Sequence, residues 1–148
     1  MKTPHFAIIG AGTAGLATAI LLAREGNHVT IFEQVDDLSP VGAGLLLQPV
    51  GLAVFEHLSV LDQALKLGAK VTGLEGQLPN KRLLVNSHYQ QAGKDFYGLG
   101  IHRATLCHVL TEKLAEYPSH VTWRMGHTID QIQETTNEVR LFGTHQQQ

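Results

Sequence analysis

The sequence His5-Phe6-Ala7-Ile8-Ile9 runs directly into Gly10-Ala11-Gly12-Thr13-Ala14-Gly15, and a helix-forming stretch, Leu16–Glu25, follows. This is the pattern G-x-G-x-x-G between a strand and a helix. Its first glycine makes the tight turn, its second lets a pyrophosphate approach the backbone, and its third lets helix and strand pack closely. The N–H groups of such a loop and the positive end of the helix dipole hold phosphate groups. The opening of the chain therefore predicts a dinucleotide-binding site.

A second predicted strand, His28–Phe32, ends in Glu33. An acidic residue about 20 residues after the glycine pattern accepts hydrogen bonds from ribose hydroxyls. The uncharged run Phe6–Ala23 is also long enough to span a membrane. However, glycines at nucleotide-loop spacing interrupt this run, and Arg24-Glu25 leads through Gly26, a good helix C-cap, into a strand and not into a processing site. We therefore expect a β-α-β unit and no membrane span.

Composition limits the remaining classes of function. With 148 residues, 43% of them hydrophobic and 16% charged, the chain has the size of one globular domain. A net charge of −2 gives no broad basic field for nucleic acid or anionic lipid. The single cysteine, Cys107, excludes an intrachain disulfide and predicts a reducing compartment, such as the cytoplasm, with the thiol as a small core residue. The nine histidines are scattered and never pair at ligand spacing with Cys, Asp or Glu, so no metal site is expected.

The rest of the chain predicts further elements. The uncharged stretch Leu38–Pro49 is expected to be a loop that lies against protein or ligand. A hairpin, a second long helix and three sheet strands should follow, and we place one domain at 1–143 with a polar tail at 144–148. The predicted segments are a helix from Pro49 with apolar positions Leu52, Val54, Phe55, Leu58 and Leu61, the paired strands Val71–Leu78 and Arg82–Val85, the helix His102–Glu116, and the strands Val121–Arg124, Thr128–Gln133 and Glu138–Phe142.

Four sequence blocks, taken in order, carry a resemblance to a known family. They are the glycine pattern, Glu33, the loop Gly42-Ala43-Gly44-Leu45 with Gln48-Pro49 after it, and Gly100-Ile101-His102-Arg103 at the start of a long helix. With these blocks the chain resembles the N-terminal part of the FAD-dependent aromatic hydroxylases, the single-component flavoprotein monooxygenases. The resemblance spans nearly the whole chain. It implies an α/β, Rossmann-like FAD-binding fold with a parallel sheet and an antiparallel β excursion.

The resemblance also implies which residues bind FAD. The backbone around Gly12 and Ala14 would hold the pyrophosphate, and Glu33 the adenosine ribose. Small residues in the loop before Gln48 would allow close approach of the flavin ring and ribityl chain, and Arg103 would contact a phosphate or ribityl oxygen. The alternatives are an ordinary exposed acid at Glu33 and a solvated helix-face charge at Arg103. The cofactor-binding residues so implied are Gly10, Gly12, Ala14, Gly15, Glu33, Ala43, Gly44, Leu45 and Arg103, and no catalytic residue is identified.

The chain departs from the family pattern in two places. The family's Pro-Asn pair after the flavin loop is Pro49-Val50 here, which removes a polar side chain. Relatives also often carry an arginine directly after the ribose acid or in the loop before the flavin block, where this chain has Gln34 and Asp36–Val41. Contacts to NADH or NADPH, the electron donor in the full-length family, are therefore not carried over.

The family pattern continues with an Asp-Gly strand end and a Gly-Asp motif that this sequence does not contain. We therefore expect a truncated chain, the FAD-binding portion of a flavin-dependent monooxygenase for a small aromatic or related substrate, inactive as this fragment. The missing strand would pair beside Phe6–Ile9, which predicts an exposed sheet edge and self-association through it. Two other interpretations stay open: the NAD-binding domain of a dehydrogenase, favoured by the glycine pattern alone, and a non-catalytic remnant or partner-dependent module.

Overall fold

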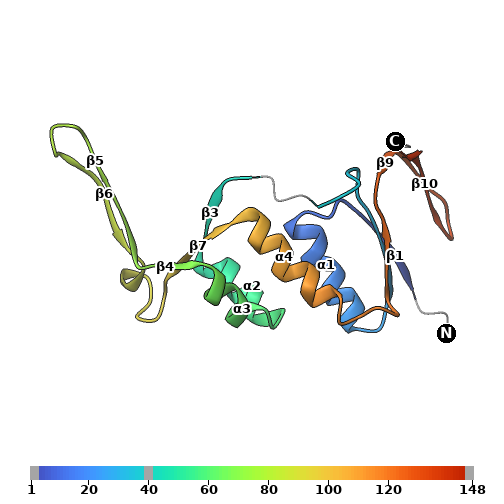
Figure 1. Ribbon diagram of the computed structural model, residues 1–148, viewed down its shortest axis with the longest axis horizontal. Helices are drawn as coiled ribbons and strands as arrows, with labels where there is room; N and C mark the ends of the chain where they lie inside the picture. Colours follow the sequence, from blue (N-terminus) through green and yellow to red (C-terminus); the bar gives the residue numbers. More distant parts are fainter. Residues whose placement is uncertain (1–3, 39–41, 146–148) are drawn as a thin grey trace. The chain divides into compact units, whose positions relative to one another are not determined.

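The computed structural model describes residues 4–38 and 42–145 and has two compact units. Unit 1 consists of Met1–Ser39 and Leu110–Gln148, and unit 2 of Pro40–Val109. Each unit contains its own sheet and helical segments (Figure 1). The chain is a mixed α/β structure with one parallel and several antiparallel sheets, which confirms the predicted fold class.

Unit 1 is built on a parallel β-α-β unit, as predicted. Strand β1 (His5–Ile9) leads into helix α1 (Thr13–Arg24), which begins three residues before the expected start, and then into β2 (His28–Phe32). Strand β8 (Val121–Arg124) adds to the other side of β2, so the parallel sheet has the order β1-β2-β8. Helix α1 packs on the sheet through residues three and four apart, which form one buried face: Leu16, Ala19, Ile20 and Ala23.

Strand β1 lies at an edge of this sheet. Of the strands that the structure describes, only β2 pairs with it. Its apolar side chains are poorly covered, because Phe6 is 38% and Ile9 50% exposed. The expected exposed edge at Phe6–Ile9 is therefore present, and a free edge of this kind is a template for another strand.

A long hairpin completes unit 1. Strands β9 (His127–Glu134) and β10 (Val139–His145) pair antiparallel, as their sequence pattern predicts. Strand β10 continues through His145, so Thr144 and His145 extend the strand beyond the expected domain end at 143. The remaining residues of the expected tail, 146–148, lie outside the described residues.

Unit 2 contains an antiparallel sheet with the order β3-β7-β4. Strands β4 (Ala69–Val71) and β3 (Gly44–Leu47) flank β7 (Gly98–His102). The expectation of a loop over Leu38–Pro49 is wrong for Gly44–Leu47, which form β3. In this strand Gly44 pairs with His102 and Leu47 with Leu99. The partner strand is distant in the sequence, so the local pattern carries no sign of it. Residues 39–41 of the expected loop lie outside the described residues.

The predicted helix after Pro49 is two helices. Helix α2 (Pro49–His57) ends before Ser59, which has a φ of 60°, and helix α3 begins at Leu61 and ends at Leu67. A non-glycine residue in the left-handed region stops a helix, and no glycine or proline marks this stop in the sequence. The buried positions Leu52, Phe55 and Leu58 follow the predicted face, whereas Val54 is exposed.

The predicted hairpin of unit 2 is present as β5 (Gly73–Gln77) and β6 (Leu83–His88), which Figure 1 shows extending from the end of β4. A 3₁₀ turn, η1 (Tyr89–Gln91), follows it. Helix α4 (Arg103–Leu114) starts in unit 2 and ends in unit 1, and it is shorter than the expected His102–Glu116. Within the described residues, no helix is long and apolar enough to span a bilayer.

Candidate functional site

The glycine-rich loop joins β1 to α1 at the carboxyl end of the parallel sheet. Gly10 has a φ of 96°, which allows the tight turn after β1, and its N–H donates to the carbonyl oxygen of Phe32 in β2 at 2.7 Å. A Cβ on Gly15 would overlap the carbonyl oxygen of Gly10 and lie 3.2 Å from Cγ2 of Ile8. A Cβ on Gly12, in contrast, would have no atom within 4 Å. Gly10 therefore serves the turn, Gly15 the packing of α1 on β1, and Gly12 leaves its backbone open to a ligand.

The start of α1 offers backbone donors beside Gly12. Gly12 is the N-cap residue, and neither a side-chain cap nor an acidic residue occupies the first turn. The first bond of the helix runs from the N–H of Leu16 to the carbonyl oxygen of Gly12. The N–H groups of Thr13, Ala14 and Gly15 come before it and have no partner within the helix. Together with the positive end of the helix dipole, they form an anion-binding end.

Glu33 lies directly after β2, with its half-buried carboxylate turned to the glycine-rich loop. Its Oε2 atom accepts a hydrogen bond from the N–H of Ala11 at 2.7 Å, and its Oε1 atom accepts one from the N–H of Val35 at 3.1 Å. Each carboxylate oxygen keeps a further lone pair, so the group can still accept a hydroxyl hydrogen. The side chain is thus part of the loop structure and not an ordinary exposed acid.

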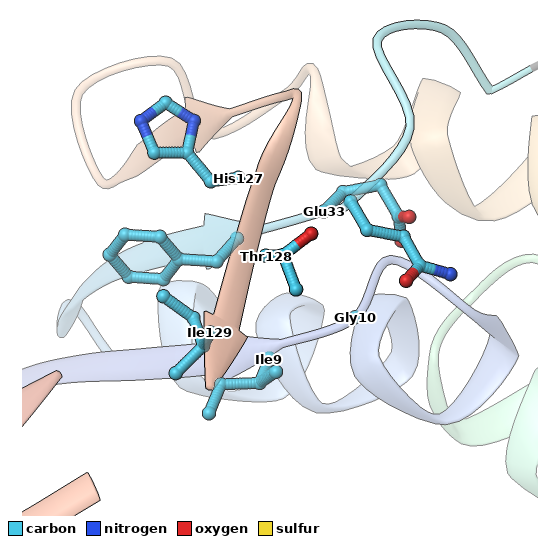
Figure 2. A pocket seen from close by; sticks show the side chains of 8 residues that line it. Ile9, Gly10, Glu33, His127, Thr128 and Ile129 are labelled. Carbon is cyan, nitrogen blue, oxygen red and sulfur yellow. The ribbon is translucent and has the colours of Figure 1, made fainter. Parts of the chain in front are cut away.

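A hollow of about 260 Å³ opens beside Glu33 at the carboxyl ends of β1 and β2 (Figure 2). Strand β9 forms a second wall, and in Figure 2 the Thr128 hydroxyl points to the side on which Glu33 lies. The His127 ring meets the Phe32 ring edge to face at 6.3 Å, and its Nδ1 atom is 2.7 Å from the carbonyl oxygen of Met125. The lining residues are Ile9, Gly10, Phe32, Glu33, Gln34, His127, Thr128 and Ile129. Open α/β sheets bind ligands at this end of their strands.

The β9 wall of this hollow is a part of the site that the sequence does not predict. The strand pattern from Thr128 carries no functional signal, because the wall depends on contacts between distant segments. The N–H of His127 donates to the carbonyl oxygen of Glu33 at 2.8 Å, and the N–H of Gly126 donates to that of Val35 at 3.0 Å. These two bonds bring the start of β9 to the end of β2.

The other four predicted residues lie together in unit 2. The N–H of Arg103 donates to the carbonyl oxygen of Ala43 at 3.3 Å, and Gly44 and Leu45 pair in β3 with the end of β7. Arg103 is the first residue of α4 and is exposed. A Cβ on Gly42, which has a φ of 145°, would come within 3.3 Å of Cβ and Cδ of Arg103. The absence of a side chain at Gly42 therefore lets the arginine stem pass beside the loop.

The nine predicted cofactor residues thus form two groups, one in each unit. Gly10, Gly12, Ala14, Gly15 and Glu33 surround the loop of unit 1, and Ala43, Gly44, Leu45 and Arg103 meet at the start of α4 in unit 2. In the part of the chain that the structure describes, no three His, Cys, Asp or Glu side chains are placed to hold a metal ion.

Comparison with known proteins gives matches along nearly the whole chain. A family model described as "FAD binding domain" matches residues 3–147. The chain is 32% identical over 145 residues to 3-amino-4-hydroxybenzoate 2-monooxygenase of Streptomyces cremeus, covering 95% of this chain and 36% of that protein. It is 28% identical over 147 residues to 3-hydroxybenzoate 6-hydroxylase of Klebsiella oxytoca, with the same two coverages of 95% and 36%.

Solved structures show the same fold. The p-nitrophenol 4-monooxygenase PnpA from Pseudomonas putida DLL-E4 matches with a TM-score of 0.86 at 22% identity, over 98% of this chain and 38% of that one. PqsL of P. aeruginosa, solved in complex with 2-aminobenzoylacetate, matches with a TM-score of 0.81 at 25% identity, over 93% of this chain and 39% of that one. The chain spans about a third of the length of the curated relatives it matches, 36% in both cases.

Proposed function

Because the chain belongs to the FAD binding domain family, we propose that it forms the FAD-holding part of a flavin-dependent monooxygenase that acts on a small aromatic substrate. The observation that carries the proposal is the loop of unit 1, where open backbone at Gly12, N–H groups at the start of α1 and the Glu33 carboxylate lie side by side. The two curated relatives, a hydroxylase and a monooxygenase of substituted benzoates, support the substrate class.

The residues of the chain suit the parts of FAD as follows. The N–H groups from Gly12 to Ala14 would bind the pyrophosphate, and Glu33 would accept the ribose hydroxyls. The hollow between β2 and β9 would take the adenosine end, since it combines apolar walls with polar groups from Glu33 and Thr128. In unit 2, Ala43, Gly44 and Leu45 would lie along the flavin and ribityl chain, and Arg103 would pair with an oxygen of the cofactor.

FAD, when bound, can accept a hydride and activate oxygen, and no side chain can perform this chemistry. In our proposal the hydride comes from NADH or NADPH, and the chain described here contributes binding and orientation. The single cysteine supports a cytoplasmic location. We also propose that the free edge of β1 pairs with a second strand, since Phe6 and Ile9 are exposed there.

FAD should bind this chain at least about tenfold more tightly than NAD. Both ligands can use the loop and Glu33, but only FAD has a flavin and ribityl chain for the residues of unit 2. Titration of the 148-residue chain with each ligand, followed by calorimetry or by flavin fluorescence, measures the two dissociation constants. Equal or tighter NAD binding would favour the dehydrogenase interpretation, and no binding of either would favour the non-catalytic one. Light scattering on the same samples tests self-association through β1.

Replacing Arg103 by alanine should weaken FAD binding roughly tenfold, since a hydrogen bond to a charged group contributes about 1.5–3 kcal/mol. The guanidinium is exposed at the start of α4, so little native structure depends on its charge. Arg82→Ala removes another exposed arginine of unit 2 and is the matched control. Titrating FAD into both variants, with melting curves to check the fold, decides the point. Wild-type affinity of Arg103→Ala for FAD would show that Arg103 does not contact the cofactor and is a solvated charge on the face of α4.

A further inference from the structure

The Glu33 carboxylate links two backbone segments. One oxygen accepts from Ala11 in the glycine-rich loop, and the other accepts from Val35 beyond the end of β2. Both bonds have good donor–acceptor lengths of 2.7 and 3.1 Å. The carboxylate therefore has a partner from the protein on each of its oxygens.

Backbone hydrogen bonds also hold the main chain of the two segments that this carboxylate links. The N–H of Gly10 donates to the Phe32 carbonyl oxygen at 2.7 Å, and the N–H of Glu33 donates to that of Arg124 at 3.0 Å. The first two N–H groups of the glycine-rich loop, those of Gly10 and Ala11, are therefore used inside the protein. The donors left for a phosphate begin at Gly12.

We propose that Glu33 is a positioning residue that fixes the glycine-rich loop through the N–H of Ala11, and so decides which loop donors face the cofactor. This goes beyond acceptance of ribose hydroxyls, because the bond from Ala11 to the carboxylate lies within the protein itself. Only the identity of the ligand rests on the proposed function. A backbone N–H that loses a partly buried partner incurs a desolvation penalty, so the loop without Glu33 would rearrange to find another acceptor.

Two substitutions separate the charge of the side chain from its two acceptors. In Glu33→Gln one oxygen becomes an NH₂ group, which would face a backbone N–H, so the side chain can accept from Ala11 or from Val35 but not from both. In Glu33→Asp the charge stays, but the side chain is one methylene shorter and cannot reach both donors. Glu25→Gln is the matched control, because it makes the same change at an exposed acid of unit 1 at the opposite end of α1 from the loop.

The test is amide hydrogen exchange of the ligand-free 148-residue chain, resolved to single residues and corrected for intrinsic rates. In the wild type, the Ala11 amide should exchange at least about tenfold more slowly than the amide of Ala14, which has no partner within the helix. At least one of Glu33→Gln and Glu33→Asp should remove most of this protection, since each variant loses one of the two bonds, while the Ile31 amide in β2 keeps its own. Glu25→Gln should change neither.

Three results would overturn the proposal. The first is equal exchange at Ala11 and Ala14 in the wild type, which needs no variant to fold. The second is wild-type protection at Ala11 in both Glu33 variants. The third is a parallel loss at Ala11 and Ile31, which would make Glu33 a general stabiliser of unit 1 and not a residue that positions the loop.

Inorganic pyrophosphate provides a second readout, because it has no ribose. If Glu33 serves only the ribose, Glu33→Asp should bind pyrophosphate as the wild type does. If Glu33 positions the loop, the affinity of Glu33→Asp for pyrophosphate should fall about threefold or more, which is roughly half a log unit in the dissociation constant. Failure of the proposed function is visible separately: a wild-type chain that protects Ala11 but binds no FAD would refute the cofactor and leave the positioning role intact.

Discussion

Gly15→Ala should lower the melting temperature of the chain by about 10 °C, the result of a loss of about 3 kcal/mol in the free energy of unfolding. The new Cβ would overlap the carbonyl oxygen of Gly10 and press on Cγ2 of Ile8 at 3.2 Å. Both neighbours belong to the turn and strand against which α1 packs, so the strain has no flexible side chain to absorb it. Either the helix moves away from β1 or the turn at Gly10 opens.

The matched control is Gly12→Ala, which adds the same methyl group at an earlier glycine of the same loop. Gly12 has a φ of −74°, which any residue adopts, and nothing lies within 4 Å of a Cβ there. Its melting temperature should therefore stay within a few degrees of the wild type, since an N-cap glycine replaced by alanine costs at most about 1 kcal/mol. Thermal melts of both variants, followed by circular dichroism, measure the difference. Equal melting of the two would show that the contact at Gly15 relaxes without cost.

The contrast between these glycines explains why unit 1 can be predicted from sequence. The tasks of Gly10, Gly12 and Gly15 follow from local backbone geometry, and the pattern that specifies them also specifies the strand before and the helix after. The four sequence blocks extend this to the family, which the match over residues 3–147 confirms. Strand β8 and the hairpin of β9 and β10 are likewise predictable, because their alternation and turn residues are local.

The features that the sequence does not predict depend on distant partners or on unmarked backbone. Leu45 and Leu46 lie in a strand only because β7 pairs with them. Ser59 adopts a left-handed conformation that its residue type does not indicate, so the sequence pattern predicts one helix where the structure has α2 and α3. The wall of the hollow at His127 and Thr128 exists because the chain returns to the end of β2 after β8. Such contacts are fixed by tertiary packing, which overrides local propensity.

Gly12→Val should abolish FAD binding, weakening it at least about 100-fold, while most of the fold remains. The structure gives a reason for the loss of binding and for the retention of the fold. No atom lies within 4 Å of a Cβ at Gly12, so the first side-chain atom of a valine meets no protein atom and we expect unit 1 to fold. In our proposal the same open space is the approach of the pyrophosphate to the N–H groups of Thr13 and Ala14, at the start of α1. A valine would fill it and keep a phosphate out of hydrogen-bond reach.

The size of the effect follows from the bonds that would be lost. A hydrogen bond to a charged group contributes about 1.5–3 kcal/mol, and two such bonds to a pyrophosphate correspond to a loss of about 100-fold or more. The measurement is an FAD titration of Gly12→Val beside Gly12→Ala, whose single methyl group should cost less, together with the melting temperature of each. If Gly12→Val melts as the wild type does and binds FAD with unchanged affinity, the glycine-rich loop is not where the cofactor's phosphates lie. If it unfolds, the space at Gly12 serves the fold and not the ligand.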